Sequence, residues 1–200
     1  MANTFAPFGF SQTGGAPGAA PNAEQAEYPI SYSDTNKIFS GDPVKITNNG
    51  VIAAWTATTG VSQLFGVFVG CKYLSVSQSK VVWSAYWPGA DAVEGSVYGY
   101  VVPCSPGTAP RFLVQTGNNN GNPATQANVG ENYDVDMGSG STVTGRSGAF
   151  LNMNAGTPTT AATLPFRIIG LYQGVGNGSD TTSQYNWVIV EANTLQTTGI

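Results

Sequence analysis

The sequence predicts an all-β protein: a single β-sandwich or barrel-like domain of about ten short strands with an extended N-terminal arm. Three observations favour this class. The 200 residues include 26 glycines and 12 prolines, which divide the chain into short segments. Those segments are rich in Val, Ile, Phe, Tyr and Trp, the residues that favour strands. No window combines a sustained helical period with capping residues, so helices are not expected.

Residues 1–29 differ in composition from the rest and predict an arm ahead of a β domain at residues 30–200. From residue 14 to residue 21 the chain contains nothing but Gly, Ala and Pro, which is typical of a flexible or partly extended linker. Phe5, Phe8 and Phe10 precede this linker, although disordered tails usually lack aromatic residues. We therefore expect these three rings to dock on a partner chain; packing on their own domain is the alternative.

The longest apolar run, residues 64–74, predicts a central strand too short to cross a bilayer. Gly66 and Gly70 within it indicate a bulge or a close approach of a neighbouring segment. We expect a bulky neighbour such as Trp83 or Trp87 to pack across these glycines. A polar turn follows, so the run and residues 80–87 are predicted to form an antiparallel hairpin.

The two cysteines lie 33 positions apart, at Cys71 and Cys104. Cys71 belongs to the apolar run and is predicted to be a buried, reduced thiol, with a disulfide as the alternative. Asn49-Gly50 between two apolar runs is a strong hairpin signal. The other expected strands cover residues 38–46 (interrupted by a turn or bulge at 41–43), 51–55, 96–102, 111–116, 129–135, 149–151, 164–172 and 186–192.

The charge pattern argues against several classes of partner. Charged residues make up 9% of the sequence, the net charge is −4, and the seven Lys and Arg residues are scattered. Nucleic-acid binding needs clustered basic residues, and membrane binding a basic amphipathic helix, so neither partner is expected. The N-terminus lacks the pattern of a signal peptide, so synthesis in a reducing cytoplasm is expected. A surface with few charges fits a protein held in an assembly.

The sequence contains no histidine, which rules out Ser–His and Cys–His nucleophile pairs. We expect no enzyme activity and no cofactor; a hydrolase using Asp134 or Asp136 is the distant alternative. Glu131, Asp134 and Asp136 are the candidate cation ligands, and a solvated surface is the favoured interpretation. Asp91 and Glu94 are interpreted as a solvated loop rather than a glycosidase pair.

Aromatic residues on the predicted strands allow a second interpretation. Trp83, Tyr86 and Trp87 would form a shelf for stacking sugars if they were exposed. On strands, such rings more often belong to the core or to cross-strand pairs.

Several stretches of the chain resemble the head decoration (capsid cement or auxiliary) proteins of tailed bacteriophages. The opening Met-Ala-Asn-Thr-Phe-Ala-Pro-Phe-Gly-Phe is similar to their N-terminal arm, and Phe-Gly-Val-Phe-Val-Gly-Cys-Lys-Tyr at 65–73 is similar to their central strand. The resemblance covers most of the chain and is carried by structural motifs. Its further stretches are residues 38–44, 85–88, 128–134, 144–148 and 164–171.

The resemblance implies a structural virion protein, made in the host cytoplasm, that binds the outside of the phage capsid and reinforces it. Its partner would be the phage major capsid protein, and self-association into a homotrimer is implied as well. No catalytic residue or cofactor is implied. Phe5, Phe8 and Phe10 would anchor the arm to capsid protein or to a neighbouring copy. The alternative function is a host-surface or glycan-binding module of a head fibre or tail.

Overall fold

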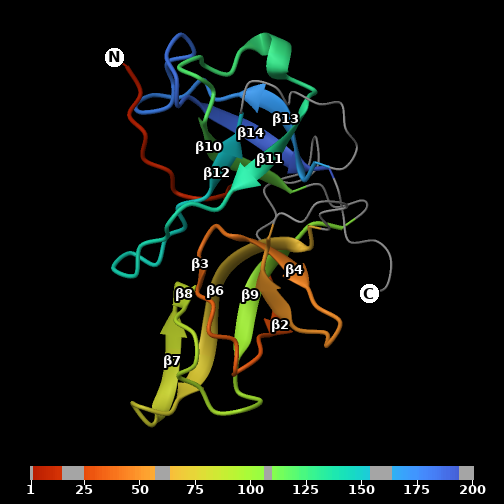
Figure 1. Cartoon of the computed structure of the whole chain (residues 1–200), viewed down its shortest axis with the longest axis vertical. Coiled ribbons are helices and arrows are strands. Elements are labelled where there is room, and N and C mark those ends of the chain that lie inside the picture. Colours follow the sequence, from red (N-terminus) through yellow and green to blue (C-terminus); the bar gives the residue numbers. More distant parts are fainter. Residues whose placement is uncertain (1, 15–24, 57–63, 106–109, 154–163, 194–200) are drawn as a thin grey trace.

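The computed structural model describes residues 2–14, 25–56, 64–105, 110–153 and 164–193. The predicted all-β class is confirmed: the described residues form 14 strands and one short 3-10 turn. The strands form two larger sheets, one from the first half of the chain and one mainly from the second half, which lie end to end (Figure 1). The additional strands are short segments of two to four residues, which single-sequence patterns do not reveal.

The N-terminal sheet has the strand order β2-β9-β6-β4-β5, with β7 beside β6. A parallel bridge between Ile30 and Ile52 joins its first and last strands, so the sheet closes on itself. β3 (Ile38–Phe39) and β8 (Tyr86–Trp87) pair as a separate ribbon. The strands of the sheet are β2 (Ala26–Pro29), β4 (Pro43–Ile46), β5 (Ile52–Ala54), β6 (Gly66–Ser75), β7 (Lys80–Ser84) and β9 (Tyr98–Pro103).

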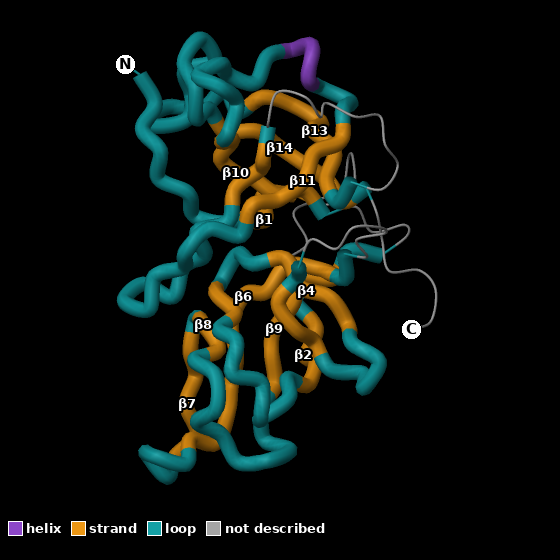
Figure 2. The backbone as a smooth tube through the Cα atoms, in the orientation of Figure 1, coloured by secondary structure: helices purple, strands orange, loops and turns teal. Residues whose placement is uncertain are grey.

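The C-terminal sheet has the order β1-β10-β12-β11-β13-β14, and β10 also pairs with β14, so it closes as well. Its first strand comes from the N-terminal arm. The 3-10 turn η1 (Gln126–Asn128) precedes β11 and is purple in Figure 2. The strands are β1 (Ser11–Gly14), β10 (Arg111–Gly117), β11 (Asn132–Asp136), β12 (Phe150–Asn152), β13 (Phe166–Leu171) and β14 (Trp187–Ala192).

The predicted hairpin of the apolar run is confirmed. β6 pairs antiparallel with β7, with Cys71 opposite Ser84. The register between β6 and β9 shifts between Phe68 and Gly70, which is the bulge that the glycine indicated. The hairpin at Asn49-Gly50 is also present, because β4 and β5 pair antiparallel on either side of it.

The expected packing of a tryptophan across the two glycines is wrong. A Cβ atom on Gly70 would lie 2.9 Å from the carbonyl oxygen of Ser84, and one on Gly66 would lie 2.5 Å from that of Val102. The nearest neighbours of both glycines are therefore the backbones of adjacent strands. Close strand approach, rather than a large side chain, explains why these positions carry glycine.

Two clusters of buried side chains support the two sheets. The first lies inside the N-terminal sheet around Trp87 and Phe68. The second lies inside the C-terminal sheet and continues through Trp55, Leu64 and Cys104, which come from the adjoining end of the first half of the chain. The two sheets thus share apolar packing where they meet.

The cysteines are buried and free, which confirms the prediction for Cys71. Burial raises the pKa of Cys71 and of Cys104 to about 12. Both groups therefore stay protonated thiols at neutral pH and act as small apolar side chains.

A buried carboxyl group, Asp42, lies at the junction of the two sheets. It accepts hydrogen bonds from the Ser147 hydroxyl at 2.5 Å and from the backbone N–H of Phe39 at 2.7 Å. The Ser147 hydroxyl in turn accepts a bond from the N–H of Ala149 at 2.9 Å. Desolvation outweighs these bonds and raises the pKa of Asp42 to about 6. This network connects β3, the turn before β4 and the segment that leads into β12.

Replacing Gly70 by valine should destabilise the fold by about 1–3 kcal/mol, because its side chain would collide with the β7 carbonyl. Gly170 offers a matched control. It also lies at a register shift between strands, but nothing lies within 4 Å of a Cβ placed there. Urea denaturation should show a large loss in the free energy of unfolding for Gly70→Val and a small loss for Gly170→Val. Equal losses would contradict a steric role for Gly70.

Asp42 should make the protein less stable as the pH rises from 5 to 7. Its pKa in the folded state, about 6, is above the unfolded value, so its protonation stabilises the fold below pH 4 and this stabilisation disappears as pH rises through 6. The expected loss between pH 5 and 7 is about 1 kcal/mol. Glu27, Asp91 and Asp180 have lowered pKa values and stay ionised over this range. In thermal melts, the stability of Asp42→Asn should not fall between pH 5 and 7. A fall equal to that of the wild type would refute the role given to Asp42.

Candidate functional site

The N-terminal arm lies on its own chain, along the C-terminal sheet (Figures 1 and 2). Its last described residues form β1, which pairs antiparallel with β10, with Ser11 opposite Leu113 and Gln12 opposite Phe112. Packing on its own domain, the alternative to docking on a partner, is the observed arrangement. Most of the expected linker, at residues 15–24, lies outside the described residues.

Phe10 is a core residue rather than a surface contact. Its side chain is 3% exposed and stacks on Phe166 with ring centroids 4.3 Å apart. The edge of a second ring, Phe112, meets it at 6.4 Å. The backbone N–H of Phe10 donates to the carbonyl of Gly41 at 2.9 Å, so the arm is also bonded to the N-terminal sheet. The predicted partner contact by Phe10 is incompatible with this burial.

The other two arm rings are less deeply placed. Phe8 is half-buried and meets the ring of Trp187 edge to face at 4.8 Å. Phe5 lies against Phe150 at 5.2 Å and Tyr185 at 5.0 Å, yet it remains 44% exposed. Of the three predicted rings, Phe5 is thus the one that presents a large apolar surface to solvent.

Two polar residues that the sequence interpretation missed hold the arm in place. The Asn3 side chain donates to the Asp180 carbonyl at 2.7 Å and accepts from the N–H of Gly178 at 2.9 Å. The fully buried Gln115 accepts from the N–H of Ala6 at 2.8 Å and donates to the Thr4 carbonyl at 2.9 Å. The glutamine inside the apolar strand at 111–116 could have indicated such a contact, because a buried amide needs hydrogen-bond partners.

The arm passes between the two sheets at Gly9, where a side chain would have no room. Gly9 has φ of +77°, and a Cβ there would lie 2.6 Å from the Cβ of Ser147 and 2.8 Å from the Gly41 carbonyl oxygen. Its N–H donates to the Ala149 carbonyl at 3.2 Å. A glycine is therefore required for the arm to pass between the two sheets.

Three exposed apolar side chains lie along the arm and the two loops that contact it. We call Phe5, Val143 and Val175 the arm face. Val143 is 94% exposed and Val175 is 98% exposed, in the loops at residues 138–148 and 172–186. Asn3 donates to the Asp180 carbonyl of the second loop and accepts from the N–H of Gly178, and the N–H of Gly9 donates to the carbonyl of Ala149, the residue that follows the first loop. Both loops extend from the body on the side of the arm (Figure 1).

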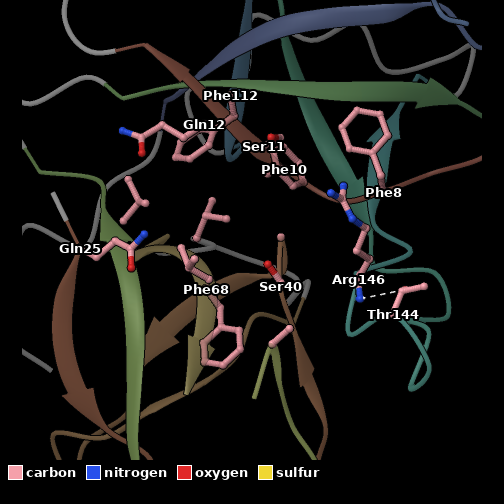
Figure 3. A pocket seen from close by; sticks show the side chains of 15 residues that line it. Phe8, Phe10, Ser11, Gln12, Gln25, Ser40, Phe68, Phe112, Thr144 and Arg146 are labelled. Atoms are coloured by element: carbon pink, nitrogen blue, oxygen red, sulfur yellow. Dashed lines mark hydrogen bonds between the residues drawn. The ribbon is translucent and has the colours of Figure 1, made fainter. Parts of the chain in front are cut away.

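An open cleft of about 390 Å³ lies between the arm and the N-terminal sheet. Phe10 and Phe112 line it from one side and Phe68 from the other, while the side chain of Arg146 extends along it near Phe8 (Figure 3). Among the described residues that line it there is no carboxylate, thiol or imidazole. Its chemistry is that of a packing or binding surface rather than of acid–base catalysis.

The predicted acidic candidates are held by separate partners. Glu131 accepts from the Tyr133 hydroxyl at 2.6 Å. Burial, with this hydrogen bond in addition, raises the pKa of Tyr133. Asp134 accepts from the N–H of Val135 at 2.8 Å, and Asp136 from the Asn118 side chain at 3.3 Å. In the described part of the chain no group of three or more Cys, Asp or Glu is placed to hold a metal ion.

The aromatic shelf, the alternative interpretation of these rings, does not assemble, whereas the favoured core or cross-strand packing is confirmed for Trp87 and Tyr86. Trp87 is fully buried, and its indole N–H donates to the Asp34 carbonyl at 3.1 Å. Tyr86 is half-buried and stacks on Phe39 with centroids 5.3 Å apart. Trp83 alone of the three is well exposed, at 68%. Its actual neighbours belong to β6 and β9 rather than to β8.

Comparison of the chain with protein-family models, with curated proteins and with solved structures found no match. Within the described residues, no helix has the length and apolar character needed to span a membrane. Functional assignment therefore depends on the surfaces of this chain.

Phe10→Ala should destabilise the protein by about 3–5 kcal/mol, because it empties a site at the centre of the C-terminal core. Phe5→Ala removes a ring of the same size from a half-open position and should cost much less. Urea denaturation of both variants provides the measurement. If the two losses were equal and small, the arm would not be part of the folded core.

Proposed function

We propose that this chain is a structural virion protein that binds the outer surface of a phage capsid lattice and stabilises it. The observation that carries the proposal is the arm face, where Phe5, Val143 and Val175 expose apolar surface along an arm and two extended loops. Single exposed apolar residues are common. These three belong to segments that extend on the same side of the molecule, so that one partner surface could contact them together (Figure 1). The proposed role is binding, without enzymatic activity or a cofactor, at the exterior of the virion.

The composition agrees with this role. Charged residues are 9% of the sequence, so contact surfaces can be covered without removing many charges from water. Association would then depend on apolar burial and on backbone and amide hydrogen bonds. The major capsid protein is the proposed partner, as the resemblance of the chain to decoration proteins implies.

The energetics favour repeated weak contacts. Burying one valine side chain contributes about 1.5–2 kcal/mol, which corresponds to about tenfold in affinity. Such a contribution is modest for one copy. We also propose a homotrimer, because three linked copies of the arm face would bind a lattice much more tightly than one copy.

The arm has a structural part in this proposal. Since Phe10 lies in the core and β1 extends the C-terminal sheet, removing the arm would damage the fold itself. Point changes at the loop tips test binding more cleanly than a deletion, because Val143 and Val175 are almost fully exposed.

Val143→Asp and Val175→Asp should each reduce occupancy on purified, undecorated expanded capsids at least tenfold, because a carboxylate would have to be buried in an apolar contact. Their melting temperatures should stay close to wild type. Co-sedimentation of added protein with capsids is the measurement, and light scattering gives the oligomeric state.

Val76→Asp is the matched control, because Val76 is 61% exposed in the turn between β6 and β7, away from the arm face. It should bind capsids as wild type does. Wild-type protein that does not sediment with capsids would refute the proposed function. Binding that survives both loop changes would refute the arm face as the contact, and a monomeric protein would refute the trimer.

A further inference from the structure

Strands β2, β6, β7 and β9 belong to the sheet at the end of the molecule away from the C-terminal sheet (Figure 1). Aromatic and charged side chains of these strands form a cluster on the outer face of that sheet. Lys72 on β6 lies opposite Trp83 on β7 and Tyr98 on β9, so these three share one face of the sheet. Tyr100 and Glu27, opposite one another on β9 and β2, complete the cluster. We call these five residues the aromatic face.

Mutual contacts fix the geometry of the aromatic face. The rings of Trp83 and Tyr100 are nearly parallel, with an interplanar angle of 7° and centroids 5.7 Å apart. The Lys72 ammonium lies 5.3 Å from the centroid of Tyr98 and 5.7 Å from that of Trp83. It is also 2.6 Å from a carboxylate oxygen of Glu27, which accepts a bond from the Tyr100 hydroxyl at 3.0 Å.

The cluster remains open to solvent in spite of these contacts. Trp83 is 68% exposed and Tyr98 is 36% exposed, whereas neighbouring positions on the same strands, such as Cys71, point into the core and are buried. An exposed tryptophan held in place by strand pairing is unusual for a surface without a partner. Because the rings stand on paired strands, little side-chain entropy would be lost when a ligand binds.

We propose that the aromatic face binds a neutral carbohydrate. The C–H face of a sugar ring would stack on Trp83, because the negative face of an aromatic ring attracts polarised C–H groups. Hydroxyl groups at the edge of the sugar would accept from the Lys72 ammonium and donate to the Glu27 carboxylate. This proposal is independent of capsid binding, since the arm face is built from other residues.

The charge of the face selects this class of ligand. Glu27 and Lys72 neutralise one another, so the cluster offers hydrogen-bonding groups without a net charge. Hydrogen bonds from Lys72 and Tyr100 lower the pKa of Glu27, so the carboxylate persists at neutral pH and balances the Lys72 ammonium, which leaves no net positive charge to attract an anionic sugar. A protein partner would have to cover a central ion pair with apolar surface, and charged groups are depleted at the centres of protein interfaces.

Tryptophan fluorescence provides a direct test on the full-length protein. Trp55 and Trp87 are buried, so quenching by acrylamide should report chiefly on Trp83, with a smaller part from the half-buried Trp187. The probes are linear oligosaccharides of glucose, mannose, galactose and N-acetylglucosamine, together with sialylated and sulfated oligosaccharides. At least one neutral probe should shift the emission and reduce quenching in a saturable way.

Trp83→Ala should weaken binding of that probe at least tenfold when it is measured by calorimetry, and Trp83→Phe should restore part of the affinity. Lys72→Met should weaken binding while leaving the rings in place. Tyr32→Ala, which removes a ring that is 41% exposed outside the cluster, is the control and should bind as wild type. Melting temperatures of all variants establish that each is folded.

Several results would overturn the proposal. These are the absence of binding by every neutral probe, binding of anionic probes alone, or unchanged affinity in Trp83→Ala. A self-association that Trp83→Ala abolishes, without any sugar binding, would identify the face as a contact between copies of the chain and would also overturn it. If the protein failed to bind capsids but still bound a sugar, the proposed capsid function would be refuted. Carbohydrate binding by the aromatic face would still be supported.

Discussion

The packing of Phe10 between Phe166 and Phe112 is the interaction on which the rest of the architecture depends. It places a residue near the start of the chain inside a core built from β10, β13 and their neighbours. β1 can then extend β10, and the N–H of Phe10 bonds to Gly41 in the other half of the molecule. Phe10 therefore connects the arm to the C-terminal sheet through its ring and to the turn before β4 through its backbone N–H. Burial of a phenylalanine contributes about 1.5–3 kcal/mol, a large share of typical stability.

This arrangement separates the two candidate surfaces in space. The arm is used to join the sheets, so the groups it leaves for contact are at its outer side, where the exposed Phe5 lies against Tyr185 of the loop that carries Val175. The aromatic face stands on β6, β7 and β9, whose inner side chains form a core of their own. Because each surface is supported by a different sheet, either can bind without distortion of the other.

The sequence was sufficient for most strands because their apolar residues are contiguous and glycine or proline marks their ends. The run at 64–74 and the pair Asn49-Gly50 are examples, and both lie in the predicted hairpins. The destination of the arm could not be predicted, because Phe10 is bound by partners more than 100 positions away. Local pattern contains no information about such contacts. Gln115 was the one local signal, and its bonding partners in the arm were equally distant.

The aromatic residues show how a small irregularity changes the functional interpretation. Trp83 and Trp87 are four positions apart, so an unbroken strand would place them on the same face. The chain instead leaves the strand at Ala85, whose carbonyl accepts the N–H of Ser40, and β8 pairs with β3. Trp87 thereby enters the core, while Trp83 stays outside beside Lys72. The alternation of side chains along a strand would by itself place both rings on one shelf. The break at Ala85 instead leaves only Trp83 of the pair exposed. Its neighbours on the same face are the tyrosines of β9 and the Glu27–Lys72 pair.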